Sequence, residues 1–231
     1  MSLLPTIVNY RQLMGQIYFI PEQMAFIRSM PELKGNEWKG DNLDKAVWSH
    51  GDGVKVKRLV RYISKALEEL QGNYCIYCGM LFGVTSGKEV EHIAPKGDGR
   101  YPQFMFTALN LVLACSLCNG FEKKERKVPR NYWDTIAGPA EHDYRDCEFT
   151  IVHPYFDDPD IHFDFVHVAG NDPKVVIEGL TAKGLCSIST FKLDEEPLTT
   201  ERVKHVEIWA KRQNPHIEKL IEETLLATLN I

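Results

Sequence analysis

Two Cys-x-x-Cys pairs constrain the fold of this chain more than any other feature of its sequence. They read CIYC, from Cys75 to Cys78, and CSLC, from Cys115 to Cys118, with 36 residues between the pairs. In each pair a tight turn aims two sulfurs at one ion, and two such turns complete a tetrahedral zinc site with four thiolates. Gly79 directly follows the first pair and suits that turn. Because four protein ligands leave zinc no open position, we expect a structural and not a catalytic site.

The remaining two of the six cysteines, Cys147 and Cys186, stand outside these pairs. A reducing compartment keeps thiols free and thiolates bind zinc well, so a metal is favoured over disulfides for the paired cysteines. Two disulfides or a redox-active dithiol are the alternative interpretations. We interpret Cys147 and Cys186 as buried thiols.

Composition excludes several classes of protein. The 231 residues are 44% hydrophobic and 26% charged, which is ordinary for a globular protein with a sizeable core. A net charge of −5 argues against a protein that coats nucleic acid through its bulk charge. Local basic segments at residues 55–65 and 123–130 have a solvated helix face as their alternative interpretation. With no apolar run near the roughly 20 residues of a membrane span and no secretory signal, we expect a cytoplasmic protein.

The chain divides into three regions, and their pattern predicts an α+β fold. Residues 1–72 form a helical region, residues 73–130 carry the chemistry, and residues 131–231 form a β/α extension. In the first region a helix is predicted to end at Gly72, a second to begin near Pro21, and residues 34–53 to form a loop. The apolar residues that recur at helical spacing before Gly72 are Val56, Leu59, Val60, Ile63, Leu67 and Leu70.

The third region contains four short β-like runs. They occupy residues 147–154, 161–168, 174–180 and 185–193, and glycine, proline, aspartate and asparagine flank them as hairpins require. A final helical stretch over residues 200–229 is expected to break or restart at Pro215. This region therefore predicts a β-hairpin followed by helix.

Between the cysteine pairs lies a second motif. Glu91 and His92 stand side by side, Asn110 follows after 17 residues, and Asn119 follows after eight more. The combination Cys-x2-Cys, Glu-His-Ile-x-Pro-Lys, Asn-Leu-x3-Cys-x2-Cys-Asn resembles the His-Asn-His (HNH) nucleases over roughly residues 73–127. This resemblance implies a ββα-metal core. Such a core has a histidine on the first strand, an asparagine in the hairpin, and a histidine or asparagine at the start of the helix.

The resemblance also implies a role for each residue of the motif. It makes His92 the general base that takes a proton from water, since a neutral imidazole titrates near working pH. It makes Glu91 a ligand of a catalytic divalent cation, which acts as the Lewis acid. Asn119 becomes the second protein ligand, and its amide oxygen favours Mg²⁺ or Mn²⁺ over softer ions. Asn110 is expected to orient the base or to pin the hairpin.

Each of these roles has a simpler alternative. For Asn119 the alternative is a cap of the following helix, and for Asn110 it is a simple turn. Adjacent residues of a strand point to opposite faces, so Glu91 and His92 serve one site only at a strand end or bulge. Pro95, just downstream, is compatible with a strand that ends there.

Basic residues near the motif are candidate nucleic-acid contacts. In the ββα fold the helix after Asn119 lies against the substrate, so its basic residues are expected to contact phosphates. Glu122 stands where family sequences often have a lysine. The resemblance favours DNA over RNA as substrate. The candidate contacts are Lys96, Lys123, Lys124, Arg126 and Lys127.

A further stretch, residues 152–170, is similar to a region of bacterial HNH nucleases from anti-phage systems such as Septu and certain retrons. In those systems an ATPase partner accompanies the nuclease. The sequence thus predicts an endonuclease of bacterial defence, with a structural Zn²⁺ and a catalytic Mg²⁺ or Mn²⁺. The alternative is a catalytically silent, zinc-stabilised nucleic-acid-binding or scaffold module. We interpret the other histidines named here as structural: His142, His153, His162 and His167.

Overall fold

The computed structural model describes residues 12–41, 43–83, 87–97, 100–119, 143–168, 174–196 and 198–204. Its helices are α1 (Pro21–Arg28), α2 (Asp52–Gln71), α4 (Pro159–His162) and α5 (Ala182–Phe191), with 3-10 helices η2 (Glu37–Lys39), η3 (Pro102–Phe104), η4 (Ala108–Asn110) and η6 (Tyr144–Asp146). Its strands are β1 (Lys88–His92), β2 (Leu111–Cys115), β3 (Phe163–Val168) and β4 (Lys174–Gly179). Helices mixed with small antiparallel sheets confirm the predicted α+β class.

The long helix α2 forms where helical periodicity predicts it. Val56, Leu59, Ile63 and Leu67 are buried on one face, at most 3% exposed. The helix ends at Gly72, whose φ of 77° an L side chain rarely adopts. The predicted start of α1 at Pro21 is confirmed as well. Residues 34–53 were expected to form a loop throughout, but the structure adds η2 within that segment.

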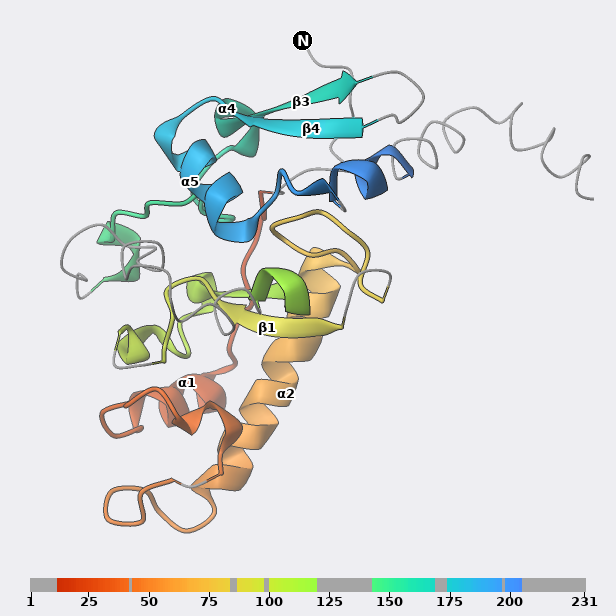
Figure 1. Cartoon of the computed structure of the whole chain (residues 1–231). Coiled ribbons are helices and arrows are strands. Elements are labelled where there is room, and N and C mark those ends of the chain that lie inside the picture. Colours follow the sequence, from red (N-terminus) through yellow and green to blue (C-terminus); the bar gives the residue numbers. More distant parts are fainter. Residues whose placement is uncertain are drawn as a thin grey trace, which may run out of the picture.

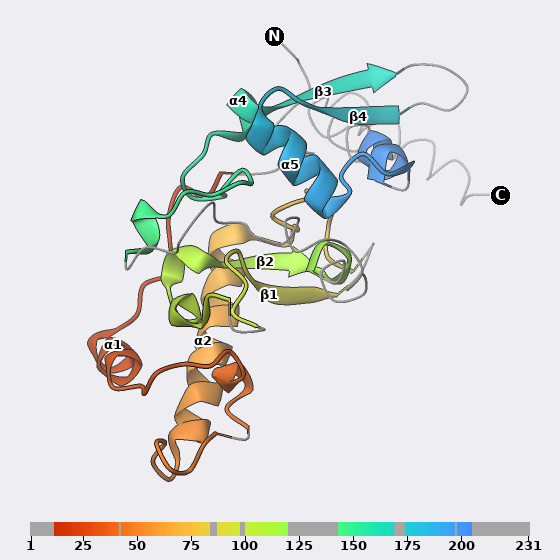
Figure 2. The same ribbon diagram turned by 60° about the vertical axis from the view of Figure 1, so that its left-hand side comes forward.

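The β1–β2 hairpin lies beside α2, at the centre of the molecule (Figures 1 and 2). In its antiparallel register Lys88 faces Cys115 and His92 faces Leu111. All five residues of β2 are buried, and α2 packs against this strand. The hairpin thus supports both the cysteine pairs and the HNH motif: Cys115 ends β2, Leu113 O accepts from Ile76 N in the first pair, and His92 ends β1.

Gln71, the last residue of α2, joins the helix to the hairpin. Its Nε2 donates to the carbonyls of Leu113 at 2.7 Å and Tyr74 at 2.6 Å, and its Oε1 accepts from Leu113 N at 2.9 Å. The residue is 6% exposed, so water does not replace these partners. One side chain therefore fixes α2, β2 and the entry to the first cysteine pair relative to one another.

The C-terminal extension contains the predicted hairpin. β3 pairs with β4 in antiparallel fashion, and Phe163 and Phe165 lie buried on the face that Val175 and Ile177 share. The helix α5 packs against β4, and Figure 2 shows it on one side of the hairpin. In both views this extension lies at the opposite end of the molecule from α1.

For two of the four β-like runs the prediction of a strand is wrong. Residues 185–193 lie mostly in α5, because Thr181 accepts from Gly184 N at 3.2 Å as an N-cap and the buried residues follow a helical period. Residues 147–154 form no strand, since side chains take their backbone donors: Ser187 Oγ accepts from Val152 N, and Asp157 accepts from His153 N. Of the expected final helix, residues 200–204 are helical, and the remainder lies outside the described residues.

Within the described part of the chain, none of the helices combines the length and apolarity needed to cross a bilayer.

Replacement of Gln71 by alanine tests the junction of α2 with the hairpin. It removes three hydrogen bonds with the backbone and leaves the buried N–H of Leu113 without this acceptor, so we expect the free energy of unfolding to fall by about 3 kcal/mol. Chemical denaturation measures this loss. Glu69→Ala, at an exposed position of the same helix, is the control and should change stability by less than about 0.5 kcal/mol. Equal stability of the two variants would contradict the role of Gln71.

Candidate active site and metal centre

The four paired cysteines converge on one point. Their ligand atoms all lie within 4.8 Å of one another, and all four residues are buried. In the first pair the chain turns back through Gly79, whose φ is 73° and whose N–H donates to Cys75 O at 3.0 Å. In the second pair Cys118 N donates to Cys115 Sγ at 3.4 Å. Both turns therefore point their sulfurs inward, as the sequence predicts.

The donor set and its spacing fit zinc. A tetrahedron with zinc–sulfur bonds of about 2.3 Å has edges of about 3.8 Å, and Cys78 Sγ lies 3.8 Å from Cys115 Sγ. All four cysteines are free thiols, so the alternative of two disulfides is wrong. In a cluster this tight, a dication is the group that allows several thiolates to lie together.

The pKa shifts of the clustered thiols also favour a bound metal ion. Hydrogen bonds with Cys118, Cys75 and Cys78 lower the pKa of the Cys115 thiol far below its ordinary value. Burial raises the pKa of Cys75, and the hydrogen bond with Cys115 is the main cause that raises the pKa of Cys118. Without a metal, one thiolate is thus stabilised by protons on its neighbours, and a bound dication takes over the role of those protons.

Outside this cluster, Cys147 is buried, as predicted, whereas Cys186 is half-buried on α5.

Glu91 and His92 lie at the end of β1. The strand stops at His92, which meets the condition that adjacent side chains serve one site only at a strand end. Both residues are buried, at 7% and 6% exposure. Immediately beyond the strand, Ile93 N donates to Asn110 O at 3.0 Å, so the chain leaves β1 along the neighbouring residue of the hairpin.

The imidazole of His92 is held on two sides. Its Nε2 lies 3.1 Å from Met105 O, and a carbonyl only accepts, so Nε2 carries the proton and Nδ1 holds the lone pair. The ring of Trp38 packs edge-on against it, with centroids 4.5 Å apart and planes at 84°. Trp38 also stacks on Phe106, at 5.4 Å between centroids. Trp38 of the N-terminal region therefore lines this site.

Asn110 pins the loop between β1 and β2. Its Oδ1 accepts from Ala94 N at 2.6 Å, while its Nδ2 donates to Ala94 O at 3.2 Å and to Phe104 O at 3.0 Å. The residue is fully buried. This is the hairpin-pinning arrangement that the sequence allowed for Asn110, and it goes beyond a simple turn asparagine.

Asn119 is the fourth residue of the helical stretch that begins at residue 116, directly after β2. Its Nδ2 donates to Glu89 Oε2. This contact crosses from the helical stretch to β1. Glu89 and Glu91 are two residues apart on β1 and share a face of the strand, so Asn119 reaches the face of β1 that also carries Glu91.

The basic residues are described only in part. Lys96 is half-buried in the loop that follows β1. That loop is crossed by Gly35, where a Cβ atom would lie 2.2 Å from Lys96 O, so only glycine permits this approach. The helix-borne candidates lie outside the described residues: Lys123, Lys124, Arg126 and Lys127.

Three side chains around the site were not predicted from the sequence. Trp38 lies in a segment rich in turn residues, and nothing in its local pattern indicates a contact with His92. Tyr144 contacts Asn110 across 34 positions of the chain, at 3.0 Å. Glu89 had a usable signal, because a carboxylate two residues before Glu91 falls on the same strand face.

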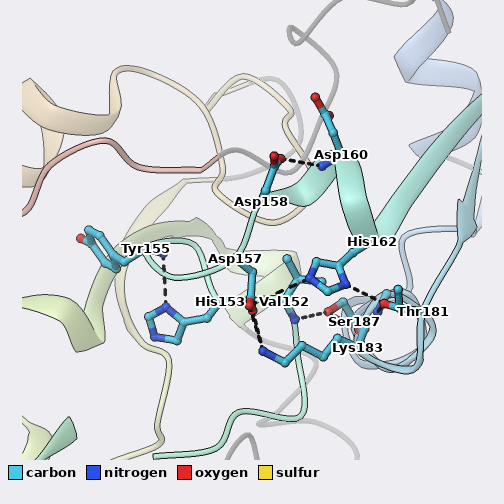
Figure 3. A network of polar contacts seen from close by, with 11 residues as sticks. Val152, His153, Tyr155, Asp157, Asp158, Asp160, His162, Thr181, Lys183 and Ser187 are labelled. Carbon is cyan, nitrogen blue, oxygen red and sulfur yellow. Dashed lines mark hydrogen bonds and ion pairs between the residues drawn. The ribbon is translucent and has the colours of Figure 1, made fainter. Parts of the chain in front are cut away.

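The polar residues around the buried His153 lie in the C-terminal extension. Asp157 accepts from His153 N at 2.7 Å and pairs with Lys183 at 2.8 Å, and Tyr155 N donates to His153 Nδ1 at 3.2 Å (Figure 3). His162 Nδ1 lies 2.6 Å from Thr181 Oγ1 in the same network. His153 and His162 are thus held by the fold, as a structural interpretation predicts.

Comparison with known proteins found no matching family model. The chain is 30% identical to "Septu protein PtuB" of Bacillus mycoides (strain KBAB4) over 153 residues, which are 62% of this chain and 50% of that protein. It is 37% identical to "Retron Vc95 putative HNH endonuclease" of Vibrio cholerae over 78 residues, 33% of this chain and 36% of that protein. A second "Septu protein PtuB", of Bacillus thuringiensis, is 40% identical over 60 residues, 26% of this chain and 23% of that protein.

The matched segments thus span half or less of the length of these curated relatives. Their names confirm the resemblance that the motif indicated: the chain is similar to "Septu protein PtuB" and to "Retron Vc95 putative HNH endonuclease", and it carries a four-cysteine cluster that fits zinc.

Proposed function

We propose that this protein is a metal-dependent endonuclease that hydrolyses DNA phosphodiester bonds in bacterial anti-phage defence, with His92 as the general base. One observation carries the proposal. His92 stands at the end of β1 with Nε2 bonded to Met105 O, so the ring proton lies on Nε2 and Nδ1 is the nitrogen that can act as a base. A base needs this fixed tautomer, because the nitrogen without a proton has to face the attacking water.

The surroundings of His92 suit that role. Hydrolysis needs a neutral imidazole, and an imidazole has an ordinary pKa of about 6.5, near working pH. The edge of Trp38 and the carbonyl of Met105 limit the ring to one orientation. A base held in one orientation does not spend free energy on ordering itself during the reaction.

A catalytic divalent cation completes the proposed site. Glu91 supplies a carboxylate oxygen and Asn119 an amide oxygen, and these hard donors suit Mg²⁺ or Mn²⁺. Since Asn119 Nδ2 donates to Glu89, the oxygen of the same amide remains for the cation. When bound, the cation supplies Lewis-acid stabilisation of the charge that develops on the phosphate and the leaving oxygen.

In this proposal the cysteine cluster binds a structural zinc. Cys118 immediately precedes Asn119, so an ion at the cluster fixes the point from which the Asn119 side chain starts. Cys115 is also the last residue of β2. Zinc therefore stabilises the start of the helix that carries a ligand and takes no part in the reaction.

The setting of the activity comes from the relatives. Two relatives are named "Septu protein PtuB" and one is named "Retron Vc95 putative HNH endonuclease". We extend that setting to this chain, with an ATPase subunit as the proposed partner. The proposal also keeps phosphate contacts for four basic residues after Asn119: Lys123, Lys124, Arg126 and Lys127. Binding of DNA without cleavage, under every divalent cation, would instead identify a silent nucleic-acid-binding or scaffold module.

Replacement of His92 by alanine tests the base. We expect cleavage of plasmid DNA, with Mg²⁺ or Mn²⁺ and the partner subunit present, to slow by about 10²- to 10⁴-fold, the usual contribution of a general base. The zinc content should stay at the wild-type value, because His92 is not part of the cysteine cluster.

The matched control is His50→Ala, which removes an exposed histidine from a loop of the N-terminal region. It should cleave DNA at the wild-type rate. If the His92→Ala protein cleaves as fast as this control, His92 is not the base.

Removal of one cysteine tests the zinc site. In Cys118→Ser we expect zinc, measured by elemental analysis, to fall well below one ion per chain. Loss of a structural ion worth about 3 kcal/mol lowers the melting temperature of a chain this long by roughly 6–12 °C. Cys186→Ser, outside the cluster, is the control. Full zinc content and an unchanged melting temperature in Cys118→Ser would rule out the structural zinc.

A further inference from the structure

Tyr144 and His153 form a buried polar chain that ends on Asn110. Tyr144 Oη lies 3.0 Å from Asn110 Oδ1 and 2.9 Å from His153 Nε2. All three side chains are at most 3% exposed. Tyr144 and His153 both belong to the C-terminal extension and stand outside the HNH motif.

Only one arrangement of protons satisfies this chain. Asn110 Oδ1 accepts but cannot donate, so the single hydroxyl proton of Tyr144 points to it. Tyr144 Oη must then accept from His153, which places a proton on Nε2. This agrees with His153 Nδ1, which accepts from Tyr155 N at 3.2 Å and carries no proton. Burial lowers the pKa of His153 to about 3, so the ring stays neutral at working pH.

The orientation of the Asn110 amide matters because Asn110 binds the two residues that follow His92 and the residue that precedes Met105. Its backbone and side chain bind Ile93 and Ala94, the two residues directly after His92. Its Nδ2 also binds Phe104 O, next to the Met105 carbonyl that accepts from His92 Nε2. A rotation of the Asn110 amide would therefore disturb the chain on both sides of the imidazole.

We propose that Tyr144 and His153 are positioning residues of the nuclease site, which lock the Asn110 amide and thereby the loop that orients His92. This proposal rests on the proposed function of His92. It makes the C-terminal extension part of the catalytic geometry and not only a surface for other proteins. A loss of 1 Å in placement of a catalytic group lowers rates by about 10²-fold, so the effect is measurable.

Tyr144→Phe removes the hydroxyl and keeps the ring. In the full chain with zinc bound, we expect kcat for DNA to fall by about 10- to 100-fold, while KM and the affinity for Mn²⁺ stay within about threefold of wild type, because no substrate or cation contact is removed. His153→Gln, which retains an N–H donor, should keep more of the wild-type kcat than His153→Leu.

Tyr155→Phe is the matched control, since its hydroxyl donates to Leu111 O at 2.7 Å in the same layer but does not touch the Asn110 side chain. Hydrogen exchange at the Ala94 amide gives a readout that needs no activity. It should be faster by about tenfold or more in Tyr144→Phe than in Tyr155→Phe. Equal kcat and equal Ala94 exchange in the two variants would overturn the positioning role. If wild type cleaves no DNA, the proposed function fails, and the Ala94 exchange still decides whether Tyr144 holds the loop.

Discussion

The central constraint of this structure is the buried side chain of Asn110. Both of its polar ends are occupied, with Ala94 and Phe104 bound on the hairpin and Tyr144 on the extension. A buried amide with an unfilled position is unfavourable by about 1–3 kcal/mol, so these partners are not interchangeable. These bonds hold the described residues of the loop between β1 and β2 next to His92.

The two ends of the β1–β2 hairpin are fixed by different means. At one end β2 terminates in Cys115, a member of the cluster that fits zinc. At the other end His92 and Leu111 form the last pair of the register, beside Asn110. Between the two ends, Gln71 fixes the hairpin to α2. A short hairpin has little stability of its own, so these attachments allow it to carry precisely spaced polar groups.

What the sequence predicted, and what it did not, follows from how local each signal is. The cysteine turns, α2 and the strand end at His92 depend on spacing within a few residues, and the structure confirms them. The segment around residue 188 is helical and not the expected strand: its isoleucine, threonine and phenylalanine favour a strand, but Thr181 caps a helix there. Contacts of Trp38 and Tyr144 with the motif are long-range, and a single sequence contains no signal for them.

The two halves of the proposed site differ in how they are assembled. The cation half, with Glu91, Asn119 and Glu89, is built from β1 and the helix start that Cys118 fixes, all within the HNH motif. The base half needs other parts of the chain, because Trp38 packs on the imidazole and Tyr144 locks the loop beside it. A segment limited to the motif would retain the proposed ligands of the cation but lose the groups that orient the proposed base. The regions flanking the motif therefore have a reason to stay attached to it that is independent of any partner they bind.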